Sequence, residues 1–251
     1  MMSYEMAMLV NWLLVAAGLL ASDLFSGLFD RGDDAVTAID GLDRNTLTNG
    51  DDVFVGDAND EFILALAGND DVSGGDGVDT IEGNTGDDTL SGGAGNDVLA
   101  GGGDTDTIFG GAGNDVLSSD RLDEDANWTR GEGEGLSGGE GDDLIYISGE
   151  DEATGGDGAD LFGVIATGED PALITDFEVG VDEIKIYVEG LDAAENGPVV
   201  RSEIDEGANL TTVSLDGAAV VQLNGQFTPE NLAVTLEDVN TIEFVPNAAI
   251  S

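Results

Sequence analysis

A nine-residue period of glycine and aspartate is the feature that most constrains what this chain can fold into. The clearest units follow one another from Gly74 to Ser118, and further units begin at Gly138 and Gly155. Weaker units lead into this run from Leu47. A short fixed period indicates that every unit builds the same turn and strand, so that the chain winds into a solenoid.

The eighth position of each unit is apolar. Glycines at the start of a unit permit the positive φ values of a tight turn, and the next residues form a short strand whose middle side chain points inward. The residues at the eighth position are Phe54, Ile63, Val72, Ile81, Leu90, Leu99, Ile108, Leu117, Ile145 and Phe162. This unbroken apolar row predicts a buried ladder inside an all-β solenoid.

The sixth position of each unit is acidic. The residues there are Asp52, Glu61, Asp70, Asp79, Asp88, Asp97, Asp106, Asp115, Asp143 and Asp160. Two carboxylates 4 Å apart repel by about 4 kcal/mol at an effective dielectric near 20, so stacked acids need a cation between them. Carboxylate and carbonyl oxygens are hard ligands that suit Ca²⁺ or Mg²⁺.

Composition narrows the possible functions. The chain has 54 acidic and only 6 basic residues, for a net charge of −48, so it repels nucleic acid. It has no cysteine and no histidine, which excludes disulfides, thiolate metal sites and Ser-His-Asp catalysis. Because 41% of the residues are hydrophobic, the chain is not a disordered acidic tail. We expect no nucleic-acid partner and no small-molecule substrate.

The repeats resemble a known family. The units match the pattern G-G-x-G-x-D-x-U-x of RTX (repeats-in-toxin) proteins, the hemolysin-type calcium-binding repeats, and the match runs from Leu47 to Gly163. The resemblance implies a parallel β-roll in which two nonapeptides make one coil. It also implies that several Ca²⁺ ions lie between stacked loops, held by sixth-position carboxylates and by backbone carbonyls near the second and fourth positions.

The resemblance names the expected ligands. The implied carboxylate pairs are Asp52/Asp70, Glu61/Asp79, Asp70/Asp88, Asp79/Asp97, Asp88/Asp106 and Asp97/Asp115. The implied backbone ligands are Gly75, Gly77, Gly86, Gly93, Gly95, Gly102, Gly111 and Gly113. Two units depart from the pattern, since Asp104 replaces a fourth-position glycine and Glu61 replaces an aspartate, and their sites are the least secure.

Two irregular stretches interrupt the period, from Ser119 to Ser137 and from Ile147 to Thr154. The first is one residue longer than two units and the second is one residue shorter than one unit, so the slips cancel. We therefore expect the roll to continue through both, with Asp143 and Asp160 forming a further ligand pair.

Residues 164–251 are predicted to form a β-rich segment that caps the roll. Ile174 to Ile186 resembles the D-F-x-x-G-x-D-x-I segment that follows RTX repeats, and there Asp176 and Asp182 either bind another ion or cap turns. The dipeptide Asp216-Gly217 lies between two apolar runs and predicts a hairpin turn.

The N-terminal segment is strongly apolar. Met6 to Ser22 has no charged residue, and we expect residues 1–29 to form one apolar helix. A membrane anchor is the favoured interpretation, with a cleaved signal peptide and a helix packed in the protein core as alternatives. Residues 30–46 form a polar linker between this helix and the repeats at 47–163. The expected fold class is thus an all-β parallel β-roll with a C-terminal β cap, preceded by one N-terminal transmembrane helix.

These patterns favour a calcium-binding, non-catalytic structural or interaction protein. We expect its roll on the periplasmic or extracellular side of a membrane, where calcium is plentiful, with a larger membrane complex as a hypothetical partner. A secreted RTX adhesin or effector is the alternative. An enzyme is a minor alternative, because neither H-E-x-x-H nor G-x-S-x-G occurs in the sequence.

Overall fold

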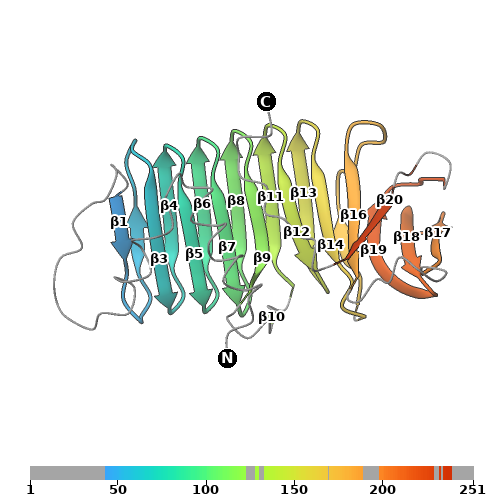
Figure 1. Ribbon diagram of the computed structural model, residues 1–251, viewed down its shortest axis with the longest axis horizontal. Coiled ribbons are helices and arrows are strands. Elements are labelled where there is room, and N and C mark those ends of the chain that lie inside the picture. Colours follow the sequence, from blue (N-terminus) through green and yellow to red (C-terminus); the bar gives the residue numbers. More distant parts are fainter. Residues whose placement is uncertain are drawn as a thin grey trace.

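The computed structural model of the protein describes residues 43–122, 128–129, 133–168, 170–188, 198–228, 232 and 234–238. These residues form two sheets of ten strands each (Figure 1). The first sheet contains β1 (Asp43–Thr46), β3 (Glu61–Ala67), β5 (Thr80–Thr85), β7 (Val98–Gly103), β9 (Val116–Leu122), β10 (Trp128–Thr129), β12 (Leu144–Ser148), β14 (Leu161–Ile165), β16 (Glu183–Val188) and β20 (Val234–Asp238).

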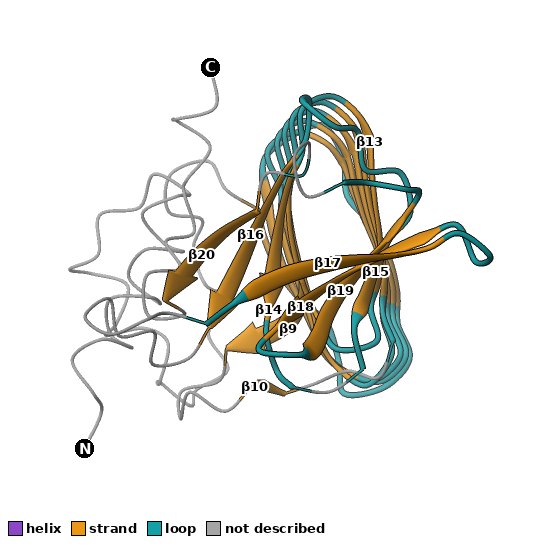
Figure 2. Cartoon of the chain, turned by 90° about the vertical axis from the view of Figure 1, so that its right-hand side faces the viewer, coloured by secondary structure: helices purple, strands orange, loops and turns teal. Residues whose placement is uncertain are grey.

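The second sheet faces the first. It contains β2 (Val53–Val55), β4 (Asp71–Asp76), β6 (Thr89–Ala94), β8 (Thr107–Ala112), β11 (Gly135–Glu140), β13 (Glu152–Asp157), β15 (Ala172–Ile174), β17 (Val200–Asp205), β18 (Leu210–Leu215) and β19 (Ala218–Asn224). Through the repeats, consecutive strands alternate between the two sheets, and the turns that join them superimpose when the molecule is viewed along its length (Figure 2).

One coil of the solenoid consists of two nonapeptide units. Ile63 pairs with Ile81 and Ile81 with Leu99, always in parallel and eighteen residues apart. In the second sheet, Val72 pairs with Leu90 in the same way. The eighteen-residue register confirms the parallel β-roll that the resemblance to RTX repeats implies.

The core is the predicted ladder of eighth-position side chains. All of them are buried except Phe54, which is partly buried in the short strand at the N-terminal edge of the second sheet. Inward residues of later coils, such as Leu136, Ala153, Ile174 and Ile184, extend the same cluster toward the C-terminus. At about 25 cal/mol per Å² of buried apolar surface, this row is the main favourable term for the described roll.

The roll continues through both irregular stretches, as expected. β11 pairs on one side with β8 and on the other with β13, so no coil is missing. Leu117 pairs with Ile145 twenty-eight residues on, and Ile145 pairs with Phe162 after only seventeen. The longer coil thus contains ten residues more than a regular one, and β10 pairs antiparallel with the end of β9.

Antiparallel strands close the C-terminal edge of the second sheet. β19 pairs in parallel with β15, and β18 and then β17 follow it in antiparallel order. The predicted hairpin turn is present, since Asp216 and Gly217 both have positive φ, as a type I′ turn requires.

The expected fold class needs one correction. The described residues contain strands and no helix, and none of their segments is a helix that could cross a membrane. They follow the two-residue alternation of inward and outward side chains, which is the period of a strand and not of a helix. The transmembrane helix is therefore removed from the fold class, and residues 1–29, to which it was assigned, lie outside the described residues.

Tight stacking of the turns makes particular glycines indispensable. Gly95 has a φ of +143°, and a Cβ built there would lie 2.6 Å from the carbonyl carbon of Gly77 in the preceding coil. Leu66, Asn84 and Asp104 occupy equivalent second or fourth positions with positive φ, which costs a non-glycine residue about 1–2 kcal/mol.

We predict that Gly95→Ala lowers the free energy of unfolding in saturating calcium by about 2 kcal/mol or more, because it adds both backbone strain and a clash. Urea unfolding followed by circular dichroism measures the change. Gly135→Ala is the matched control, since its Cβ would meet no atom within 4 Å. Equal effects of the two substitutions would contradict the stacking seen here.

Candidate metal centre

The sixth-position acids form two buried rows, one leading into each sheet. Each aspartate of these rows stands directly before a strand, as Asp79 does before β5 and Asp88 before β6, and Glu61 is the first residue of β3. Among the predicted ligands of this kind, Asp52 alone is not buried, and it lies in the first turn of the roll. Carboxylates are seldom buried without a partner, so these rows mark the part of the roll that carries chemistry.

A repeated hydrogen bond connects each acid to the acid of the next coil. The backbone N–H of Asp79 donates to Oδ1 of Asp97 at 2.8 Å, and that of Asp97 donates to Oδ1 of Asp115 at 2.8 Å. The irregular coils keep this bond, from Asp115 to Asp143 at 2.8 Å and from Asp143 to Asp160 at 2.9 Å. The same bond joins Asp52/Asp70, Glu61/Asp79, Asp70/Asp88 and Asp88/Asp106. The structure thus brings together every pair that the sequence proposed.

The second oxygen of these carboxylates is buried and accepts no hydrogen bond. This holds for Oε2 of Glu61 and for Oδ2 of Asp70, Asp79, Asp88, Asp97, Asp106, Asp115 and Asp143. A buried polar atom left without a partner costs about 1–3 kcal/mol, and more if it is charged. A row of such atoms, one for each half-coil, requires either protons or cations.

Several of these free carboxylate oxygens lie beside a backbone carbonyl oxygen. A Cβ built on Gly92 would lie 2.7 Å from the carbonyl oxygen of Gly110 and closer still to Oδ2 of Asp97. The same two kinds of oxygen converge at Gly83, Gly110 and Gly138. Two oxygen atoms that point at one small space, with no hydrogen between them, are ligands of the kind that a hard cation such as Ca²⁺ binds.

The backbone oxygens nearest these carboxylates come from first-position glycines, which the sequence analysis did not include. The carbonyls involved are those of Gly74, Gly101, Gly110, Gly138 and Gly155. The second- and fourth-position glycines that were expected as ligands have positive φ. Where two of them stack, the carbonyl of one lies against the glycine of the next coil, as the carbonyl of Gly75 does against Gly93. The glycines predicted as ligands therefore line the stacked turns, and their binding of calcium stays a prediction.

Burial changes the acidity of the row. Desolvation is the largest cause that raises the pKa of Asp97, Asp106 and Asp143 to about 7, and that of Asp88 and Asp115 to about 6. The pKa of Glu61 rises to about 7, and those of Asp79 and Asp160 to about 6, for the same reason. The backbone N–H that donates to each carboxylate lowers its pKa, but the increase caused by burial is larger.

Asp176 and Asp182 differ from the repeat acids. Asp176 accepts the backbone N–H groups of Gly155 and Gly156, both at 2.9 Å. Asp182 accepts those of Asp160 at 3.1 Å and Glu178 at 2.7 Å. Asp176 thus holds strand β13, whereas Asp182 continues the bond of the acidic row from Asp160 and caps the turn at Glu178. The binding of a further ion by either residue stays a prediction.

The sequence analysis missed two members of the acidic rows. Glu134 and Asp151 are buried, and the N–H of Glu134 donates to Oδ1 of Asp151 at 3.2 Å. They stand before β11 and β13, in the places that sixth-position acids occupy elsewhere. The available signal was an acid two residues before an inward Leu136 or Ala153, without the preceding glycines of a full unit.

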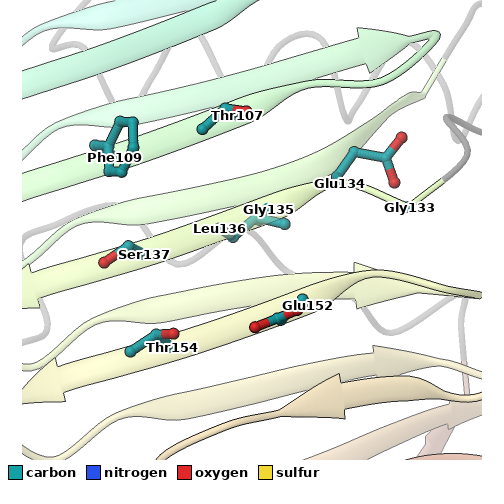
Figure 3. Close-up of a pocket in the computed structure, with 9 residues that line it drawn as sticks. All are labelled: Thr107, Phe109, Gly133, Glu134, Gly135, Leu136, Ser137, Glu152 and Thr154. Carbon is teal, nitrogen blue, oxygen red and sulfur yellow. The ribbon is translucent and has the colours of Figure 1, made fainter.

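Within the described ranges, no three acidic side chains gather into one metal-binding cluster. An ion held here would therefore complete its coordination with backbone oxygens or water. A hollow of about 240 Å³ lies on the second sheet, lined by Phe109, Ser137, Glu152 and Thr154 and, from the acidic rows, by Glu134 (Figure 3). It is smaller than the usual range of roughly 300–1,000 Å³ for ligand pockets.

Comparison with known proteins agrees with the geometry. The sequence profile of the RTX calcium-binding nonapeptide repeat (4 copies) matches residues 46–81 and again 82–117. The chain carries RTX calcium-binding repeats. The two matched RTX segments contain eight of the sixth-position acids described above, from Asp52 to Asp115. A comparison with curated protein sequences gives no match.

Two solved structures resemble this chain at low similarity. The extracellular lipase LipA from Serratia marcescens shares 14% identity over 80% of this chain, with a TM-score of 0.26. The AlgE6R3 subunit of the Azotobacter vinelandii mannuronan C5-epimerase shares 18% identity over 79% of this chain and 86% of its own, with a TM-score of 0.22. This chain spans 41% of the length of the lipase.

The raised pKa values predict how pH acts on the metal-free roll. An acid with a folded pKa of about 6–7 and an ordinary value of 3.8 favours folding while it is protonated. This stability is fully present below about pH 4 and is lost as pH rises through 6–7. Circular dichroism and urea unfolding of dialysed, metal-free protein should show less β structure at pH 8 than at pH 5. A metal-free roll that becomes more stable over this range would refute the assignment.

Asp97→Asn should have opposite effects with and without calcium. In calcium it removes a ligand charge, and we expect roughly tenfold weaker binding, or about 1.4 kcal/mol. Without metal it removes a buried charge and places an amide near the carbonyl of Gly110, so stability at pH 8 should not fall. Asp71→Asn, at an exposed position on β4, is the control that should change neither measurement. Loss of stability in both conditions would assign Asp97 a purely structural role.

Proposed function

We propose that this protein is a non-catalytic structural module whose roll folds when its acidic rows bind calcium, and that it works where calcium is in the millimolar range. The observation that carries the proposal is the row of buried carboxylate oxygens that face carbonyl oxygens and accept no hydrogen bond. Calcium, when bound, supplies the positive charge that these paired acceptors lack.

The chain's own residues provide everything else that the site needs. The backbone N–H ladder fixes Oδ1 of each carboxylate, which leaves Oδ2 aimed at the space between coils. The inward aliphatic row holds the coils in register, so that all sites form together. Coupled folding and binding follows, because the ligands of one ion come from coils that are adjacent only in the folded roll.

The proposed location follows from affinity. Extracellular calcium modules bind at roughly 10⁻⁴ to 10⁻³ M, far above cytosolic calcium, so the roll is expected to fold outside the cytoplasm. A secreted module, such as an adhesin, is one form of this function that would meet calcium at such concentrations. The membrane complex expected from the sequence as a partner stays a prediction.

A calcium titration tests the proposal. We expect the β signal of the full chain at pH 7.5 to rise cooperatively with calcium, and to disappear when EGTA is added. Stability should grow as RT ln(1 + [Ca²⁺]/Kd) for each site, or about 2.7 kcal/mol at a hundredfold excess over Kd. Magnesium at the same concentration is the control and should be far less effective, because it demands a small octahedral site. Full β structure in EGTA would overturn the proposal.

A further inference from the structure

The outer face of the first sheet carries apolar residues that are almost inaccessible to water. Val116, Leu144, Tyr146, Ile165 and Tyr187 form this buried cluster, with Val98 and Leu161 packed against it. They alternate along their strands with the inward ladder, so they point away from the core. We call these seven residues the outer apolar face.

The register assembles this face from four or more neighbouring strands. Val98 pairs with Val116, Val116 with Leu144, and Leu144 with Leu161, which gives one continuous row. Beside that row, the ring centroids of Tyr146 and Tyr187 lie 5.9 Å apart. Both rings lie against Gly163, where a Cβ would contact both of them. Burial raises the pKa of both tyrosine hydroxyls.

The corresponding face of the second sheet is different. Thr107, Phe109 and Glu152 occupy outward positions there and are exposed, Phe109 by 46%. Tyr146 on the first sheet is only 3% exposed. The outward side chains of a two-sheet solenoid are solvated unless something covers them, so the low exposure of the outer apolar face indicates a cover.

No described strand lies across this face. β9, β12, β14 and β16 contact their neighbours in the sheet and, through the core, the opposite sheet. Because the low exposure is that of the single chain, the cover comes from chain outside the described residues. We propose that the apolar N-terminal segment, Met6 to Ser22, docks on the outer apolar face of its own roll.

Sequence and geometry favour this occupant. Asn11, Gly18 and Ser22 are its only residues that are not apolar, and it has no charge, which matches an uncharged face. The described chain begins at β1, at the edge of the same sheet and five strand spacings from β12, or about 24 Å. The twenty residues between the segment and β1 reach up to about 66 Å when extended, so the linker is long enough.

Photocrosslinking of the full, calcium-loaded chain tests the proposal. The protein has no cysteine, so Ala16→Cys gives a single position for a benzophenone label. We expect crosslinks within one chain to β9, β12, β14 or β16, identified by mass spectrometry in a mixture of ¹⁴N and ¹⁵N protein. Crosslinks to the second sheet, crosslinks between two chains, or no crosslinks would overturn the proposal. The same label at Ile242 tests the C-terminal segment, and its attachment to this face in place of residue 16 would also overturn it.

A second measurement does not depend on crosslinking. In a Trp128→Phe background, Trp12 is the only tryptophan, and its fluorescence reports the surroundings of the segment. Leu161→Glu on the outer apolar face should shift its emission to longer wavelength and increase its quenching by acrylamide several-fold. Phe109→Glu on the second sheet is the matched control and should leave both unchanged. Emission that ignores Leu161→Glu, in protein that keeps its β signal, would show that the segment lies elsewhere.

Discussion

The hydrogen bond from the N–H of each sixth-position acid to the carboxylate of the next coil is the contact on which the roll depends. It uses one oxygen of each sixth-position acid from Asp70 to Asp160 and thereby determines where the other oxygen points. The same bond fixes the distance between coils, so the aliphatic ladder and the oxygen pairs share one register. A structure of this kind gains stability coil by coil, through contacts with nearest neighbours only.

The architecture places favourable and unfavourable energies in different parts of each coil. Burial of one aliphatic side chain per unit supports the strands, whereas the turns contain positive φ values, close backbone contacts and desolvated carboxylates. The inward row alone therefore has to offset a large local cost at every turn. Neutralisation of the carboxylates removes the greatest part of that cost, which explains why the acids and the glycines occur in the same short motif.

Much of this could be predicted from the sequence because the motif repeats. The period predicted the solenoid and the ladder, and the resemblance to RTX repeats implied the eighteen-residue coil and the acid pairs, including Asp143 with Asp160. Glu134 and Asp151 were missed because their units lack the glycines on which the alignment was made. The role of first-position carbonyls was also missed, since the pattern of side chains does not reveal where backbone oxygens point. The outer apolar face was missed because Val98, Val116 and Leu144 lie in seventh positions, which are polar in several other units.

The ten additional residues between β9 and β11 show that coil length and coil register are independent in this fold. Twenty-eight residues separate Val116 from Leu144, yet the two still pair in parallel. The connection at this corner of the solenoid is therefore a natural point for growth by insertion. Segments grafted there would be displayed beside the roll without changing its interior. This corner is therefore suited to carrying new binding loops on a rigid, ion-dependent rod.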